Sequence, residues 1–295
     1  MENKKCKPFL KWVGGKTQIL QQIIDKFPKN INTYKEIFLG GGSILIELLQ
    51  NNNINIKEIK AYDFNKNLIF TYKTIKNNVD KLINKLQNII TEYKNIEKIK
   101  DTLRKPTTYE ERLISKECYY YYIRNKYNKI INNNDIMIAV YFIFLNKTCF
   151  RGVHRIGPNG FNVPFGNYKN PNIICVDNIR KLSKLFKKVN FYHMDFRKSI
   201  IDNNIDNFIY MDPPYVPENE KSFTKYNVNG FNEKDHIELF KICNNIKCNF
   251  LMSNSNTLLV KNNMKKFKIE EIECKRSINS INPGSKVKEI LILKK

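Results

Sequence analysis

Short apolar runs alternate along the chain with segments of helical periodicity. A run of about four to eight apolar residues bounded by polar or turn residues is typical of a buried strand. Seven segments fit this description, at residues 34–39, 59–63, 189–196, 208–215, 249–255, 267–274 and 287–293. Apolar residues at helical spacing predict helices between several of them, at residues 19–24, 44–49, 173–186 and 235–246. Strands that alternate with helices indicate an α/β sheet.

A long helical block interrupts this alternation. Residues 71–104 carry apolar residues at helical spacing, a further helical stretch contains Tyr119–Tyr122, and the apolar segment 136–145 is typical of a buried helix. The run of tyrosines favours core packing. We interpret the block as a subdomain inserted into the α/β domain. The expected division is a main domain at residues 1–70 and 171–295 and a helical subdomain at 71–170, with a hairpin loop at 148–168.

The chain has a large excess of positive charge. Its 295 residues include 51 Lys and Arg against 28 Asp and Glu, so the formal net charge is +23. Such an excess favours a polyanionic partner, nucleic acid first and an anionic membrane surface second. The alternative is a composition bias, because the Asn runs at 51–53 and 132–134 suggest an AT-rich genome, which also enriches Lys. Charge alone leaves both interpretations open.

The cysteines and histidines show no metal-ligand spacing. Seven cysteines are scattered without a C-x-x-C pair, and the three histidines lie far apart in the sequence. We therefore expect reduced thiols in a cytosol-like compartment and no metal. The N-terminus leads into no apolar signal core. The longest apolar run, at 136–145, is far shorter than the ~20 residues that span a bilayer, so we expect no membrane partner and no secretion.

The segment Asp212-Pro213-Pro214-Tyr215 carries the strongest chemical signal. It follows the apolar run 208–211 directly, and its prolines stop the strand because proline lacks the N–H that a sheet ladder needs. A carboxylate, two conformationally fixed carbonyls and an aromatic ring therefore meet at the carboxyl end of a strand. In open α/β sheets, ligands bind at that edge.

A second signal is the glycine turn Phe38-Leu39-Gly40-Gly41-Gly42-Ser43, between a predicted strand and a predicted helix. Glycines let the backbone approach a ligand, and the N-terminus of the helix is electropositive. Asp63 ends the next strand about twenty residues later, a spacing that suits a carboxylate bonding the ribose hydroxyls of an adenosine-containing cofactor. The alternative for Asp63 is a helix N-cap before Leu68, and the two roles are compatible.

The segment Gly14-Gly15-Lys16-Thr17 is similar to a phosphate-binding loop but lacks its first glycine, since Leu10 and Lys11 stand at that place. We therefore favour another role for it. Trp12 is the only tryptophan, and it suits either ordinary core packing or a stacking platform beside the turn.

The loop after the apolar helix contains Arg151 and Arg155, together with a Pro158-Asn159-Gly160 turn that predicts a hairpin. Arginine is the commonest reader of guanine, through a bidentate contact to O6 and N7. The alternative is that these arginines contact only phosphate or solvent.

Four motifs occur in the order of a known family: residues 9–16, 38–43, 151–166 and 212–215. Together they resemble the Dam family of DNA adenine-N6 methyltransferases, the alpha group or D12 class. The resemblance covers nearly the whole chain and includes Phe223-Thr224-Lys225-Tyr226 and the tail Arg276-Ser277-Ile278 with Lys286, Val287 and Glu289. It implies a class I S-adenosylmethionine-dependent methyltransferase fold, Rossmann-like, with a mostly parallel seven-stranded sheet and one antiparallel strand. The block at 71–170 then becomes a target-recognition subdomain.

The resemblance also implies roles for individual residues. It assigns catalysis to Asp212, Pro213, Pro214 and Tyr215. It assigns contacts with S-adenosylmethionine to Trp12, Lys16, Phe38, Gly40, Gly42, Asp63, Asp195, Phe196 and Asp212. It assigns contacts with double-stranded DNA to Lys11, Asn146, Arg151 and Arg155. The family's usual site is G-A-T-C, but the loop departs from relatives at Arg151, His154 and Gly157 and lacks a residue before Phe161. The implied location is the cytoplasm of a bacterial cell or of a virus-infected host.

The chemistry explains why this corner suits methyl transfer to a base. The exocyclic amine of adenine is a poor nucleophile because its lone pair is delocalised into the ring. Two acceptors, the Asp212 carboxylate and the Pro213 carbonyl, can localise that lone pair, while the Tyr215 ring stacks on a base flipped out of the duplex. Cytosine-N4 methylation, an inactive DNA-binding relative, and RNA or protein methylation are the alternatives. The sequence leaves oligomeric state and pairing with a restriction endonuclease open.

Overall fold

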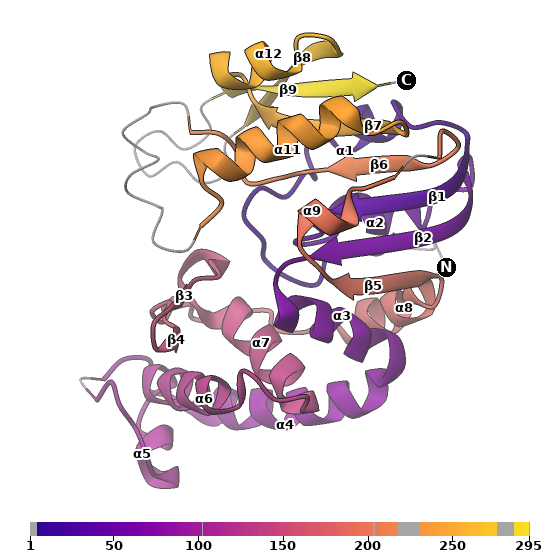
Figure 1. The fold of residues 1–295 in the computed structure, drawn as a ribbon. Coiled ribbons are helices and arrows are strands. Elements are labelled where there is room, and N and C mark those ends of the chain that lie inside the picture. The colour runs from indigo at the N-terminus through magenta and orange to yellow at the C-terminus, as the bar shows by residue number, and fades with distance from the viewer. Residues whose placement is uncertain (1–4, 102, 203, 218–229, 276–285, 295) are drawn as a thin grey trace. The chain divides into compact units, whose positions relative to one another are not determined.

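A computed structural model describes residues 5–101, 103–202, 204–217, 230–275 and 286–294 (Figure 1). The chain forms two compact units. The first, here called the helical unit, comprises Met1–Gly15, Gly40–Gln50 and Asn65–Lys187. The second, the sheet unit, comprises Lys16–Leu39, Asn51–Phe64 and Lys188–Lys295.

The sheet unit is built on seven strands. They are β1 (Asn30–Ile37), β2 (Asn55–Asp63), β5 (Val189–His193), β6 (Phe208–Met211), β7 (Asn249–Ser255), β8 (Lys268–Lys275) and β9 (Lys286–Lys294). Their order is β5-β2-β1-β6-β7-β9-β8. Adjacent pairs from β5 to β7 are parallel, whereas β9 is antiparallel to both β7 and β8. The predicted fold, a mostly parallel seven-stranded sheet with one antiparallel strand, is confirmed.

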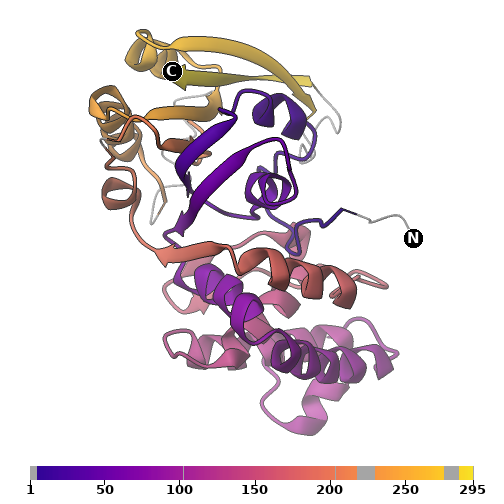
Figure 2. The ribbon, with the colours of Figure 1, turned by 90° about the vertical axis from the view of Figure 1, so that its right-hand side faces the viewer.

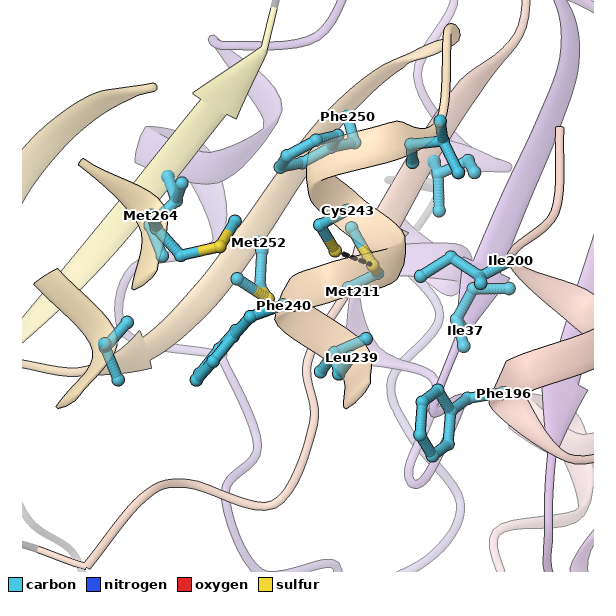
Figure 3. Close-up of a cluster of buried hydrophobic side chains, with 14 of the residues drawn as sticks. Ile37, Phe196, Ile200, Met211, Leu239, Phe240, Cys243, Phe250, Met252 and Met264 are labelled. Atoms are coloured by element: carbon cyan, nitrogen blue, oxygen red, sulfur yellow. Dashed lines mark hydrogen bonds between the residues drawn. The ribbon is translucent and has the colours of Figure 1, made fainter. Parts of the chain in front are cut away.

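Both faces of the central strand β6 are buried. On one face, α11 (Glu233–Asn245) packs Leu239, Phe240 and Cys243 against Met211 and its neighbours (Figure 3). On the other face lies α1 (Leu20–Ile24), as Figure 2 shows. Burial on both faces explains why β6 is apolar throughout rather than alternating.

The α1 face carries the polar side chains that matter for the site. The ring of Phe27 packs there against Phe208 at 4.8 Å and Tyr210 at 6.1 Å. The Tyr210 hydroxyl lies 2.9 Å from the Ser253 hydroxyl, and the Tyr34 hydroxyl donates to Glu36 at 2.8 Å. This face of the sheet therefore combines an aromatic layer with a buried polar network. The described part of the unit also contains α9 (Phe196–Ser199) and α12 (Leu258–Met264).

The helical unit contains seven helices and a short hairpin among the described residues. They are α2 (Ser43–Leu48), α3 (Lys66–Asn77), α4 (Val79–Asn95), α5 (Tyr109–Leu113), α6 (Lys116–Ile130), α7 (Ile136–Thr148) and α8 (Val176–Phe186), with a 3-10 turn at Phe150–Gly152 and strands β3 (Ile156–Gly157) and β4 (Gly160–Phe161). The single helical stretch expected at 71–104 is two helices, because the chain leaves helical geometry at Asn78.

Aromatic rings fill the core of the helical unit. Tyr93, Tyr119 and Phe144 form a triangle of ring contacts with centroids 5.3–6.0 Å apart. Tyr119, Tyr120 and Tyr121 are all buried, which confirms that this run of tyrosines packs the core. The apolar helix α7 packs against α3, α4 and α6. None of the described helices is long and apolar enough to cross a bilayer.

The helix-capping alternative for Asp63 is wrong. Helix α3 begins after Asn65, whose side chain accepts a hydrogen bond from the Leu68 N–H at 3.0 Å. Asp63 is instead the last residue of β2. The amide oxygen of Asn65 is correctly placed for the cap, since an N-cap side chain bonds an N–H in the first turn.

The compact units do not follow the division expected from the sequence. Residues 5–15, α2 and α8 belong to the helical unit, although the sequence assigned them to the main domain. The division into compact units does not show which residues bind cofactor or DNA. The assignment of 1–70 and 171–295 to catalysis and of 71–170 to target recognition therefore stays a prediction.

The buried His236 predicts that stability falls in acid. His236 lies in α11, and its ring packs edge-on against Phe231, with the ring centroids 4.7 Å apart. Burial lowers the pKa of His236 to about 4. The unfolded chain takes up a proton below about pH 6.5, whereas the folded chain does so only near pH 4, so acid favours unfolding in that window. Urea unfolding should show that His236→Gln removes about 2 kcal/mol of the stability lost between about pH 7 and about pH 5.

The exposed His193 provides the matched control. The variant His193→Gln should keep the wild-type dependence of unfolding free energy on pH. An equal dependence in the two variants would contradict the assignment to His236.

Candidate active site

Asp212 follows the last residue of β6 and forms a buried ion pair. Its Oδ1 lies 2.9 Å from Nζ of Lys16, and the side chains are 22% and 5% exposed. The ammonium of Lys16 also lies 4.7 Å from the centroid of the Tyr215 ring. All three residues belong to the sheet unit. The structure thus joins Lys16 to the Asp-Pro-Pro-Tyr corner and gives its ammonium a carboxylate partner.

Burial controls the protonation of this corner. The pKa of Asp212 is raised, chiefly by burial and further by the nearby negative charge of Glu289, while the ammonium of Lys16 acts in the opposite direction. Burial also raises the pKa of Tyr215 well above its usual value, so its hydroxyl keeps its proton. The site therefore combines a carboxylate of increased proton affinity with a hydroxyl that acts as a donor.

Glu289 is a member of this cluster to which the sequence assigned no role. The Tyr215 hydroxyl donates a hydrogen bond to Oε2 of Glu289 at 2.8 Å. Glu289 lies on β9, where it pairs with Ser255 of β7. The available signal was a single acid within the apolar run 287–293, a position where a carboxylate is costly unless it has a partner.

The backbone just after Tyr215 is held by two side chains from the end of β7. The N–H of Val216 donates to Oδ1 of Asn254 at 3.2 Å, and the Ser255 hydroxyl donates to the Val216 carbonyl at 2.6 Å. Asn254 and Ser255 are both buried. Both backbone groups of Val216 are thereby satisfied, which fixes the chain that leaves the Asp-Pro-Pro-Tyr corner.

Other predicted residues stand at the carboxyl ends of neighbouring parallel strands. Phe38 follows β1, Asp63 ends β2, and Asp195 with Phe196 follows β5. Since β5, β2, β1 and β6 are adjacent in that order, these residues and Asp212 all belong to one edge of the sheet. This is the edge where ligands bind in open α/β sheets.

The edge is aromatic as well as acidic. The ring of Phe38 lies 5.7 Å from Phe196 and 5.6 Å from Phe231. Phe38 has a φ of 67°, which is unfavourable for a bulky side chain and is typical of strained backbone at functional sites. Aromatic rings and carboxylates in one place fit the adenosine part of a cofactor, which offers a flat base and hydroxyl donors.

Asp195 already has an internal partner. It caps α9 by accepting from the Arg197 N–H at 2.8 Å, and its Oδ2 lies 3.0 Å from the Arg197 guanidinium. Arg197 also bonds Glu238 at 2.7 Å and Asp235 at the start of α11. No pattern in the sequence indicates this role of Arg197, because its acidic partners come from two separate segments.

In the helical unit, Trp12 lies against the glycine turn. A Cβ added to Gly40 would come within 2.8 Å of Trp12 Nε1, and one on Gly41 within 2.9 Å of Trp12 Cβ. The indole also stacks on His154 at 5.8 Å, and burial lowers the pKa of His154 to about 4. Gly40 and Gly42 both have positive φ, so glycine is required there for conformation as well as for space.

Three of the predicted DNA contacts lie together in the helical unit. Asn146 is buried, and its carboxamide bonds both the N–H and the carbonyl of Lys11 at 2.8 Å. The ammonium of Lys11 lies 4.0 Å from the centroid of the Tyr168 ring, and the Tyr168 hydroxyl accepts from the Arg151 N–H at 3.0 Å. Lys11 and Arg151 are exposed and share Tyr168, whereas the amide of Asn146 is used within the protein.

Arg155 stands at the start of the predicted hairpin, which is present as β3 and β4. Its Nε donates to Oδ1 of Asn162 at 2.6 Å. Arg155 is exposed. The guanidinium is therefore tethered at one edge and presented to solvent.

Two further expectations are the motif segments after Asp-Pro-Pro-Tyr and the absence of a metal site. The motif segments Phe223–Tyr226 and Arg276–Ile278 lie outside the described residues. Among the described residues, no group of three or more His, Cys, Asp or Glu side chains is arranged to hold a metal ion.

Comparison with known proteins agrees with this geometry. Residues 12–278 match the model of the family described as D12 class N6 adenine-specific DNA methyltransferase. The chain is 38% identical over 305 residues to the type II methyltransferase M.MjaIII of Methanocaldococcus jannaschii, covering 98% of this chain and 99% of that protein. It is 32% identical to the type II methyltransferase M1.LlaDCHI of Lactococcus lactis subsp. cremoris, covering 97% and 94% of the two chains. It is 28% identical to the DNA adenine methylase of Escherichia coli K12, covering 99% and 96%. The chain therefore belongs to the D12 class of N6 adenine-specific DNA methyltransferases.

Proposed function

We propose that this chain transfers a methyl group from S-adenosylmethionine to N6 of an adenine flipped out of duplex DNA. The observation that carries the proposal is the cluster of Lys16, Asp212, Tyr215 and Glu289 at the carboxyl end of β6. It supplies an acceptor for the amine and an aromatic ring for the base, in a chain that belongs to an adenine-specific family.

Asp212 and the backbone after it activate the amine. The carboxylate and the Pro213 carbonyl accept the two N–H groups of N6, which localises the nitrogen lone pair. The ring of Tyr215, over which the Lys16 ammonium lies, would stack on the flipped base. Burial keeps water from competing for these acceptors.

S-adenosylmethionine, when bound, supplies a methyl group on a positively charged sulfur. Asp63 would bond its ribose hydroxyls, and Phe38, Asp195 and Phe196 would contact its adenine. Family motifs also assign Trp12, Lys16, Gly40 and Gly42 to the cofactor. The aromatic cluster and the strained backbone at Phe38 support this assignment. Since Lys16 bonds Asp212, its ammonium serves the catalytic carboxylate too.

Lys11, Arg151 and Arg155 would contact DNA, with the net charge of +23 supplying general affinity for phosphate. We assign Asn146 to positioning Lys11, because its amide bonds both backbone groups of that residue. The segment 71–170 with its loop at 148–168 would read the target, and 1–70 with 171–295 would carry out catalysis. G-A-T-C is the first site to test. Because the substrate is DNA, we place the protein in the cytoplasm of a bacterial cell or of a virus-infected host.

The reaction and its site are tested together. Duplexes with and without G-A-T-C, incubated with S-adenosylmethionine labelled in its methyl group, should yield labelled N6-methyl-2′-deoxyadenosine after digestion to nucleosides. Label in N4-methylcytosine, or no label in DNA, would refute the proposal. Labelling of adenine that is equal in both duplexes would reject G-A-T-C alone.

Asp212→Asn should lower the rate of methyl transfer about a hundred- to thousand-fold, since it removes the charged acceptor and keeps the shape. Binding of S-adenosylmethionine, followed by calorimetry, should remain measurable. In the wild type, activity should fall as the pH drops through the raised pKa of Asp212, because only the ionised carboxylate accepts both from Lys16 and from the amine. Full activity of the variant would remove Asp212 from its role.

Arg155→Ala should weaken discrimination between the preferred site and single-base variants of it by about ten- to a hundred-fold, the value of one bidentate base contact. Competition methylation assays measure this ratio directly. Arg180→Ala is the control, because Arg180 is exposed in the same unit and pairs with Asp80. An unchanged ratio in Arg155→Ala would exclude it as a base reader.

A further inference from the structure

We propose that Glu289 is a positioning residue for methyl transfer, which holds the Tyr215 ring in place and supports Asp212 as the acceptor of the proton released from N6. The inference rests on the proposed function. It assigns a task to the strand β9, which the amine-activating motif itself does not include.

The geometry begins with the two ends of the tyrosine side chain. Its hydroxyl donates to Glu289 at 2.8 Å, and the ammonium of Lys16 lies 4.7 Å from the ring centroid. Its Cα end is fixed by Pro214 on one side and by the Asn254 and Ser255 bonds to Val216 on the other. With the hydroxyl held as well, the plane of the ring is set before a base arrives. A stacking surface that is already oriented loses little entropy on binding.

The register of the sheet explains why Glu289 can reach this hydroxyl. β9 pairs with β7 so that Glu289 stands opposite Ser255, and β7 pairs with β6 so that Met252 stands opposite Met211. Side chains alternate along a strand, so Glu289 points to the same face as Ser255, Ser253 and the Asp212 end of β6. The neighbouring positions Ile290 and Ile292 are buried in the core on the other face.

The second part of the task is electrostatic. Four groups face the Asp212 carboxylate: the ammonium of Lys16, the carboxylate of Glu289, and the hydroxyls of Tyr215 and Tyr210, with Glu36 on β1 interacting with Tyr210. Lys16 favours the ionised form of Asp212, and Glu289 opposes it. Two carboxylates beside one ammonium give the cluster an excess negative charge, which favours the uptake of one proton.

The reaction releases one such proton. When the amine nitrogen forms its bond to the methyl carbon, the bond from that carbon to sulfur breaks and the nitrogen becomes positively charged. The nitrogen then loses a proton: the N–H bond breaks and an O–H bond forms on Asp212. The negative charge of Glu289 stabilises the protonated Asp212 relative to the ionised form. The pKa of Tyr215 is raised well above its usual range, so the hydroxyl keeps its own proton throughout.

The experiment compares Glu289→Gln with wild type in single-turnover methylation of duplex DNA across pH. The amide still accepts from Tyr215 but has no charge. The rate should fall about ten- to a hundred-fold, and the acid limb of the pH–rate profile should move to lower pH by about one unit. Dissociation constants for S-adenosylmethionine and for DNA should change by less than about two-fold. Glu289→Asp, which restores the charge, should recover the wild-type position of the acid limb.

Glu271→Gln is the matched control, because Glu271 is an exposed acid on the adjacent strand β8 and its loss changes the net charge equally. It should keep the wild-type rate and profile. A wild-type rate and profile in Glu289→Gln would overturn the inference, and so would a rate loss accompanied by an unchanged acid limb.

Tyr215→Phe tests the same hydrogen bond by removing its donor. It replaces Glu289→Gln as the test if that variant does not fold. It keeps the ring and removes the hydroxyl, so a slower transfer with normal DNA binding supports the inference and a wild-type rate overturns it. If wild type itself transfers no methyl group to adenine, the proposed function fails. If wild type is active and these variants are unaffected, only the role of Glu289 fails.

Discussion

The ion pair between Lys16 and Asp212 is the interaction on which the rest of the site depends. A buried carboxylate is costly unless a cation and hydrogen-bond donors compensate it. Lys16 supplies the cation from a segment near the N-terminus, so the ion pair ties the Gly-Gly-Lys-Thr segment to the end of β6. Without this partner the pKa of Asp212 would be higher still, because the ammonium of Lys16 favours the ionised carboxylate. The Tyr215 ring lies next to this pair, and the Tyr215 hydroxyl in turn bonds the carboxylate of Glu289.

The parallel sheet turns separate strand ends into one site. Residues at the carboxyl ends of β5, β2, β1 and β6 become neighbours only because the strands are ordered in that way. The antiparallel strand β9 then brings Glu289 to the Tyr215 hydroxyl, and β7 brings Asn254 and Ser255 to the following backbone. Side chains from two later strands, β7 and β9, therefore position the four residues to which we assign catalysis.

Local patterns predicted much of this protein. The strand that ends at Met211 was predictable because prolines cannot continue a ladder, and the glycine turn because Gly40 and Gly42 need positive φ. Helix ends were harder to predict. Asn65 rather than Asp63 caps α3, because polar residues close together in the sequence compete for one cap. The expected helix at 71–104 is divided by non-helical backbone at Asn78, which no break in the apolar spacing marks. Tyr119, Tyr120 and Tyr121 pack the core as expected, and consecutive rings can all be buried because α5, α7 and β4 pack against α6.

By itself the sequence determined the fold class, the family and the residue types of the Asp-Pro-Pro-Tyr corner, because these follow from contiguous motifs and from their order. Only the tertiary structure decided which side chains serve that corner from a distance. Lys16 bonds Asp212, and Glu289 bonds Tyr215. Such partners depend on strand order and register, which bring residues far apart in the chain within 3 Å of one another. No periodicity in the sequence encodes that proximity, because hydrophobic patterns specify which face of a strand is buried and not which strand lies beside it.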